Sequence, residues 1–313
     1  MKKKTAYRIR NWREYNRALK QRGSLTVWVS QDALAHWTTN DLTGAPGASP
    51  TYTDLAIETM AAVQAIYRLA GRQTQGFLQS IFALMKLALT VPDHSTLSRR
   101  RRGLKVTLPI QDWSKPRHLV VDSTGVKVYG EGEWKVRQHG VSKRRTWLKL
   151  HLCVDAATLE TVSAVASTND ISDAEVLADL LAGVPGKLEQ VSADGAYDQR
   201  KCYDTLNQHH AKAAIPPRKG ARIWQHGNCK TERHVRDQNL RRIRQVGRQQ
   251  WKQESNYHRR SLAETTVFRF KTIFGDRLQT RRVENQFKEL LLKTSILNQM
   301  THLGMPDSIK IEG

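Results

Sequence analysis

The order of strand and helix patterns after residue 117 constrains the fold more than any other feature of this sequence. Three runs with strand character come first, and helix patterns then alternate with two further short apolar runs. In chain order these segments lie at 119–121, 147–154, 161–166, about 172–181 (helix), 191–193, from about 199 (helix) and 213–215. Three strands, helix, strand, helix and strand predict a mixed sheet covered by helices, which is an α/β domain.

The region before this sheet has helical patterns instead. After a basic arm over 1–22, two apolar helical segments occupy about 53–69 and about 74–89. A short segment then begins at Asp93, a favoured N-cap residue, and ends in Arg99, Arg100, Arg101 and Arg102. A helix, a turn and a short arginine-rich helix fit a helix-turn-helix near 74–102, with the second helix in the major groove of DNA. The arginines also suit an ordinary solvated helix end, because cations are favourable at a helix C-terminus.

The charge balance favours a polyanionic partner. The chain carries 51 Lys and Arg against 29 Asp and Glu, a formal net charge of +22. Most of the excess lies in residues 1–110 (17 basic and 6 acidic, +11) and residues 216–282 (18 basic and 5 acidic, +13). Nucleic acid is the first candidate and an anionic membrane the second. No stretch approaches the roughly 18 apolar residues of a spanning helix, and no apolar segment follows the basic N-terminus as in a secretory signal.

The cysteines argue against a disulfide scaffold. Only three occur, Cys153, Cys202 and Cys229, and their wide spacing suits a reducing cytoplasm. His226, Cys229 and His234 lie close together in the sequence, but there is no Cys-x-x-Cys pair. A basic loop that happens to contain them is therefore the better interpretation than a zinc site.

Two aspartates follow short apolar runs. Asp122 comes directly after Leu-Val-Val and Asp194 directly after Val-Ser-Ala, each just before a small residue. Strand ends of an α/β sheet are where binding sites form, because side chains there project into a crevice. Carboxylates held together in such a place are costly unless a cation accompanies them, and a divalent metal ion is one solution. Each aspartate alone could instead cap the turn that follows it.

A third carboxylate lies in a patterned segment. Tyr257, Arg260, Glu264 and Lys271 fall at offsets of 0, 3, 7 and 14. On one continuous α-helix these offsets place all four within an arc of about 60°. Such a stripe is either an exposed salt-bridged face or a metal-binding carboxylate flanked by groups that hold phosphate.

The same residues resemble a known family. Tyr257-x2-Arg260-x3-Glu264-x6-Lys271 is similar, without a gap, to the Tyr-Arg-Glu-Lys signature of bacterial insertion-sequence transposases of the DDE class. Asp194-Gly195-Ala196-Tyr197 resembles the Asp-Gly-x-Tyr box of that family, and the segment from Val121 to Gly125 resembles its first-aspartate box. The tail at 304–308 also looks like that of one subgroup. The resemblance is strongest over 118–300.

The resemblance implies an RNase H-like mixed-sheet catalytic domain with an N-terminal, mainly helical DNA-binding domain. It implies that Asp122, Asp194 and Glu264 are the catalytic residues and ligands of two Mg²⁺ ions, for which Mn²⁺ would substitute. The expected activity is binding of terminal inverted repeats, metal-dependent strand cleavage at the element ends and joining of the 3′-hydroxyl ends to target DNA. The expected partners are double-stranded DNA and at least one further copy of the chain, in the cytoplasm of a bacterium and associated with its nucleoid. The expected domains are 1–22 (basic arm), 23–113 (DNA binding), 114–300 (catalytic, with a basic insertion at about 216–256) and 301–313 (tail).

Further DNA contacts are expected outside the carboxylates. The resemblance assigns the DNA backbone near the cut to Tyr257, Arg260 and Lys271, and guanidinium groups suit phosphate. Trp134, in a charged glycine-rich turn, either stacks on an unpaired base or packs across its own hairpin. The remaining expected contacts are Arg99, Arg100, Arg101, Arg241 and Arg244. Two alternative functions are a transposase-derived DNA-binding regulator without cleavage, against which the intact triad argues, and a standalone nuclease, against which the large basic N-terminal region argues.

Overall fold

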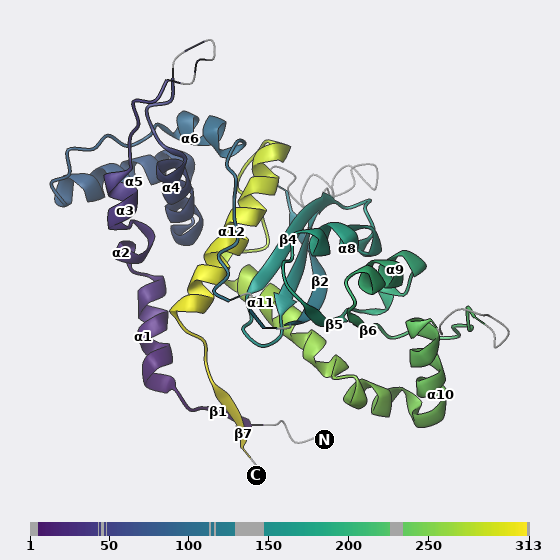
Figure 1. Cartoon of the computed structure of the whole chain (residues 1–313). Helices are drawn as coiled ribbons and strands as arrows, with labels where there is room; N and C mark the ends of the chain where they lie inside the picture. The colour runs from purple at the N-terminus through teal and green to yellow at the C-terminus, as the bar shows by residue number, and fades with distance from the viewer. Residues whose placement is uncertain are drawn as a thin grey trace, which may run out of the picture. The chain divides into compact units, whose positions relative to one another are not determined.

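The computed structural model describes residues 6–42, 44, 47, 49–112, 114–115, 117–128, 147–225 and 234–311 (Figure 1). The chain divides into two compact units. The terminal unit combines Met1–Thr107 with Ser295–Gly313, and the sheet unit is Leu108–Thr294. Across the described residues, no helix is both long and apolar enough to cross a membrane.

The sheet unit contains one mixed sheet of five strands, in the order β4-β3-β2-β5-β6. β2, β3 and β4 form an antiparallel meander, whereas β5 runs parallel to β2 and β6 runs parallel to β5. The strands are β2 Arg117–Lys127, β3 Trp147–Asp155, β4 Thr161–Thr168, β5 Leu188–Ser192 and β6 Lys212–Ala214. The α/β class and the predicted order of strands and helices are confirmed.

Helices cover both faces of this sheet (Figure 1). Alternation along β2 sends Leu119 and Val121 into a core with α8 (Asp173–Ala182) and α9 (Arg200–Gln208). The opposite face, which includes Val120 and Asp122, packs against α11 (Ser261–Phe274). Polar residues placed on that second face therefore lie between the sheet and α11.

The basic segment after β6 forms helix α10, Val235–Glu254. Its helical geometry breaks at Gly247, where φ is 81°, a left-handed value that glycine adopts without strain. The two parts remain tied together, because Arg242 pairs with Glu254 at 2.7 Å across the break. A 3₁₀ turn, η2 (Tyr257–Arg260), then leads into α11.

Helix α4, Asp54–Tyr67, is the centre of the terminal unit. Its side chains are buried on most sides, which is typical of a helix surrounded by others. The surrounding helices, all in contact with α4, are α2 Leu25–Trp28, α3 Gln31–Ala35, α5 Gly71–Leu84 and α6 His94–Arg101. The rings of Trp37 and Phe82 meet edge to face at 5.1 Å in this core.

The two sequence ends of the terminal unit pair with each other. Strands β1 (Ala6–Ile9) and β7 (Ser308–Ile311) form a two-stranded antiparallel ribbon. Beside it, Arg10 pairs with Asp307, and Asn11 bonds to the backbone of Met305 and Asp307. Part of the segment expected to be the tail, 301–313, thus pairs with the N-terminal strand in this unit.

Other local features also differ from the sequence-based expectations. Residues 12–22 of the expected basic arm form helix α1 (Trp12–Arg22). Helix α12, Val283–Leu303, follows α11; its first part belongs to the sheet unit and its last part to the terminal unit. The connection between α5 and α6 has nine residues, 85–93, which is longer than the three or four residues of a helix-turn-helix turn.

Candidate functional site

Asp122 and Asp194 occupy equivalent positions on neighbouring strands. The parallel pairing of β2 with β5 ends with Val120 opposite Ser192. Each aspartate lies two residues beyond its member of that pair. Because side chains alternate along a strand, both aspartates emerge on the same face of the sheet, side by side.

The local settings of the two aspartates differ. Asp122 lies inside β2, which continues to Lys127, and is paired with Leu152 of β3. The expectation that a strand ends at Asp122 is therefore wrong, although the parallel neighbour β5 does end beside it. Asp194 follows β5 and caps the short turn η1 (Gly195–Tyr197), where its Oδ1 accepts the Ala196 N–H at 2.8 Å. Capping and membership of a shared site therefore coexist at Asp194.

Glu264 reaches this face from α11. The helix begins at Ser261, so Tyr257 and Arg260 belong to the preceding 3₁₀ turn and not to one continuous α-helix as expected. Glu264 lies in the first turn of α11, and its side chain is 55% exposed. Ala263, Thr266 and Phe270 form the buried side of the helix, which leaves Glu264 on its outer edge.

Arg260 joins two of the three carboxylates. Its Nη1 lies 3.3 Å from Asp122 Oδ2, and its Nη2 donates to Glu264 Oε1. The side chains of Arg260 and Asp122 are 20% and 21% exposed, so this contact is partly shielded from water. A single guanidinium therefore balances carboxylates that come from β2 and from α11.

Burial and neighbouring carboxylates change the pKa of Asp122. Burial raises the pKa of Asp122 above its usual range, and the carboxylates of Asp194 and Glu264 raise it further. The Ser123 N–H and Arg260 act in the opposite direction. The three predicted carboxylates are thus close enough to influence one another. Nevertheless, no three or more His, Cys, Asp or Glu side chains of the described residues are grouped so that they could hold a metal ion.

Of the other signature residues, Tyr257 lies beside this cluster and Lys271 lies further along α11. Tyr257 is half-buried, its ring lies 5.9 Å from that of Trp251, and burial raises the pKa of its phenol. Lys271 is also half-buried and lies seven residues after Glu264, which is the same face of α11. Sequence reasoning did not single out Phe268, a further candidate contact, which is one helical turn beyond Glu264 and 70% exposed. Its spacing of four from Glu264 was a signal that could have identified it.

The expected DNA contacts on α10 are partly engaged by the protein. Arg241 Nη2 donates to the Gln225 carbonyl at 3.1 Å, and Arg241 is half-buried. Arg244 is exposed, with a long contact of 3.4 Å to the Ala221 carbonyl. Arg244 is therefore the freer of the two for an external phosphate.

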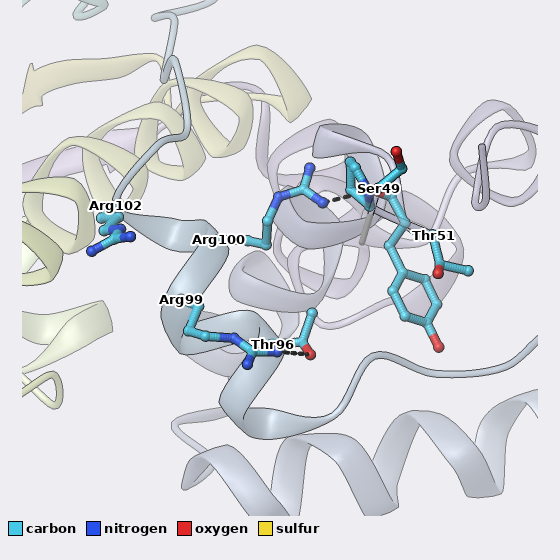
Figure 2. Close-up of a pocket in the computed structure, with 8 residues that line it drawn as sticks. Ser49, Thr51, Thr96, Arg99, Arg100 and Arg102 are labelled. Atoms are coloured by element: carbon cyan, nitrogen blue, oxygen red, sulfur yellow. Dashed lines mark hydrogen bonds between the residues drawn. The ribbon is translucent and has the colours of Figure 1, made fainter. Parts of the chain in front are cut away.

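The arginines of α6 have three different environments. Arg101 is 5% exposed and donates to Gln64 of α4, so it lies in the core of the terminal unit. Arg100 bonds the Tyr52 carbonyl at 2.9 Å and the Asp54 carboxylate at 2.7 Å. Arg99 is exposed and bonds Thr96 of its own helix. A pocket of about 530 Å³ lies between α6 and loop 49–52, and Figure 2 shows Arg100 pointing toward the loop and Arg102 pointing away from it.

Two sequence-based interpretations fall outside the described residues. Trp134 is within 129–146, so neither base stacking nor hairpin packing is tested for it. His226 and Cys229 are within 226–233, and of that trio only His234 is described, as the N-cap of α10. Cys153 and Cys202 are buried free thiols.

The family of this chain is shown by family models. Two family models, each described as a transposase DDE domain, match residues 113–299 and residues 20–131. Among solved structures, the chain is similar to a piggyBac transposase synaptic complex with hairpin DNA, with 13% identity over 95% of this chain and 76% of that chain and a TM-score of 0.39. It is also similar to a Drosophila P element transposase strand transfer complex, with 12% identity over 59% of this chain and 46% of that chain and a TM-score of 0.32.

Proposed function

Because the chain belongs to the transposase DDE domain family it is a DNA transposase, and we propose that it binds the terminal inverted repeats of its own element, cuts DNA at the element ends and joins the freed 3′-hydroxyl groups to target DNA. The observation that carries this proposal is the arrangement around Arg260, which contacts Asp122 and Glu264 beside Asp194. The mixed sheet, with an antiparallel meander followed by two parallel strands, supports an RNase H-like catalytic domain.

The donor chemistry of the site fits divalent metal ions, which members of this family use. Asp122, Asp194 and Glu264 are hard oxygen ligands of the kind that Mg²⁺ prefers. Arg260 indicates where the protein requires positive charge, since it already neutralises two of these three side chains. Two Mg²⁺ ions, or Mn²⁺ in their place, would activate the attacking hydroxyl and stabilise the leaving oxygen of the cleaved phosphodiester.

The protein groups around the carboxylates then position the DNA. In this proposal Arg260 leaves its carboxylate partners when the cations bind and turns its planar guanidinium to a backbone phosphate. Tyr257 is held against Trp251 and Lys271 shares the face of Glu264, so both are placed to hold the strand near the cut. Arg244 supplies a further phosphate contact, and the pairing of two element ends requires at least two copies of the chain.

The decisive experiment is a nicking assay on a duplex that carries the terminal repeat flanking the coding sequence. Wild-type protein, Glu264→Gln and Glu254→Gln are compared in Mg²⁺, Mn²⁺ and EDTA, with binding measured separately. Glu254 is the matched control, because it is a carboxylate of the same unit that pairs with Arg242 away from the site. We expect cutting at the repeat boundary in wild type and in the control, and a loss of about 100-fold or more in Glu264→Gln with binding retained.

The same assay separates the alternative function. Tight and specific repeat binding without cutting in any metal ion would favour a transposase-derived regulator. Normal cutting by Glu264→Gln would contradict the assignment of the third carboxylate.

A further inference from the structure

Helices α4 and α5 are joined by three residues only, Arg68, Leu69 and Ala70. Arg68 adopts a left-handed conformation (φ 54°), which ends α4 abruptly. Beyond the turn, the ring of Tyr67 at the end of α4 meets Phe77 of α5 at 5.5 Å. A helix-turn-helix joins its two helices by a turn of three or four residues, and the three-residue connection between α4 and α5 has this length.

Helix α5 has one buried face and one exposed polar face. Thr74, Leu78 and Phe82 are buried, and their spacing of four places them on one side. The opposite side carries Arg72, Gly76, Gln79 and Ser80, all exposed. At about 100° per residue these four lie within an arc of about 100°. The helix is therefore held to the unit by one side and presents a continuous stripe on the other.

The stripe contains Arg, Gln and Ser, which are residue types that DNA-binding proteins use to recognise base edges. Arginine makes paired hydrogen bonds to guanine, glutamine makes them to adenine, and serine bonds either. Within the described part of the chain, the side chains of Arg72 and Gln79 make no hydrogen bond or ion pair, so both are available. Gly76, between them, has no atom within 4 Å of where its Cβ would be. A glycine lowers helix stability but lets another molecule approach the backbone closely.

The charge around α5 also fits DNA. No acidic residue occurs between Glu58 and Asp93, a stretch that includes all of α5 and both of its connections. Within it, Arg68, Arg72 and Lys86 are basic. Near a polyanion, a helix without carboxylates on its outer face or flanks meets no like-charge repulsion.

By contrast, α6 is poorly placed to read bases. Two of its arginines are committed to α4 and to the residues before it, through Gln64, Asp54 and the Tyr52 carbonyl. Its arginines therefore fasten α6 to α4, which leaves Arg99 as the exposed guanidinium within that helix.

From these observations we infer that α5, rather than α6, lies in the major groove and reads the sequence of the element ends through Arg72 and Gln79. This inference rests on the proposed function, because it assumes that the chain distinguishes its own ends from other DNA.

The test is selection of bound sequences from a duplex pool with 20 randomised base pairs, using the full-length chain. Wild type is compared with Arg72→Ala and Gln79→Ala, and with the control variants Arg13→Ala and Gln31→Ala, which change exposed residues of the same types on α1 and α3. We expect wild type and both controls to enrich one motif. Each α5 variant should lose preference at one or two positions of that motif, with about 5- to 150-fold less discrimination there.

Additional variants separate base reading from general attraction. Arg99→Ala should lower affinity for all sequences alike and leave the motif unchanged, as expected for a phosphate contact. Gly76→Glu adds a carboxylate to an open part of the stripe and should abolish enrichment, while thermal unfolding stays within a few degrees of wild type.

The outcomes distinguish a failure of the α5 assignment from a failure of the proposed function. A wild-type motif that persists unchanged in both α5 variants would overturn the assignment of α5 and leave the proposed function intact. Loss of the motif in Arg99→Ala would overturn it in favour of α6. Absence of any motif or repeat cutting in wild type would contradict the proposed function itself.

Discussion

The position of Arg260 predicts that this residue and metal ions compete for the same carboxylates. Replacing Arg260 by Gln removes the guanidinium from both Asp122 and Glu264 but keeps a polar side chain of moderate length. Without metal, the variant is left with neighbouring carboxylates whose mutual repulsion is no longer balanced. It should therefore be less stable than wild type in EDTA and gain more stability from Mn²⁺.

The magnitude follows from the exposure of the partners. The contact with Asp122, at 3.3 Å between side chains that are about one fifth exposed, lies between a surface pair (about 0–1 kcal/mol) and the loss of a partner from a buried pair (about 3–5 kcal/mol). We therefore assign about 1–2 kcal/mol of stabilisation to the contact between Arg260 and Asp122. The contact with Glu264 adds only about 0.3–0.5 kcal/mol, because that carboxylate is 55% exposed. A total of about 1.3–2.5 kcal/mol corresponds to roughly 3–10 °C in Tm for a unit of this size.

The same free energy sets the effect on metal binding. If Mn²⁺ must displace Arg260 from its partners, removing that contact should tighten Mn²⁺ binding by about 10- to 60-fold. Calorimetric titration of the DNA-free protein measures the affinity, and thermal unfolding at rising Mn²⁺ concentration measures the linked stability. Arg259→Gln is the matched control, because Arg259 is the neighbouring arginine and bonds the Ala156 carbonyl, not a carboxylate. Equal Mn²⁺ affinity in wild type and Arg260→Gln would refute the competition.

Three further predictions concern single contacts. Lys293→Met leaves the buried carboxylate of Glu289 without its 2.6 Å partner and should lower the free energy of unfolding by about 3–5 kcal/mol in urea titrations. Burial alone would raise the pKa of Glu289, but Lys293 and hydrogen bonds from Gln279 and Thr280 lower it. The stabilisation from the ionised Glu289 is therefore present above pH 4.5 and is lost as the pH falls below that value. A difference in unfolding free energy between wild type and Lys293→Met that does not shrink in acid would contradict this. Gly304→Ala should cost about 1–3 kcal/mol, because its Cβ would lie 2.9 Å from that of Ala18, whereas Gly76→Ala should be neutral or stabilising in the same melts. Phe268→Ala should bind a duplex with an unpaired end about 5- to 150-fold more weakly and Phe268→Trp normally, with Val283→Ala as the exposed apolar control; equal binding by all would exclude stacking by Phe268.

The sheet was predictable because its signals are local. Alternation over 147–154 and the short apolar runs identify strands from a few residues each, and the intervening helices carry their own periodicity. Asp93 is likewise confirmed as the N-cap of α6, since its Oδ1 accepts the Ser95 N–H at 2.7 Å. These features depend on neighbours in the sequence and on little else.

The remaining features depend on partners that are distant in the sequence. The strand passes through Asp122 because β3 pairs with it for longer than β5 does. Arg101 is buried beside Gln64 of another helix, which accepts a hydrogen bond from its Nη2. Helical spacing predicted that Tyr257 and Lys271 lie on one helical face, but Tyr257–Arg260 form a 3₁₀ turn. A 3₁₀ turn differs from an α-helix in that its hydrogen bonds span three residues instead of four, and this difference leaves no clear pattern in the sequence. The assignments of the carboxylates and of the DNA contacts stay predictions until they are tested.

The discontinuous terminal unit also has a consequence for biosynthesis. Its helical part is translated first, but β7 and the end of α12 follow only after the 187 residues of the sheet unit. At about 5–20 residues per second, this part waits roughly 10–40 s on the ribosome for its missing strand and helix. The sheet unit, although encoded later, is therefore the first that can fold to completion, and the terminal unit remains open to chaperones and proteases until residues 295–311 emerge.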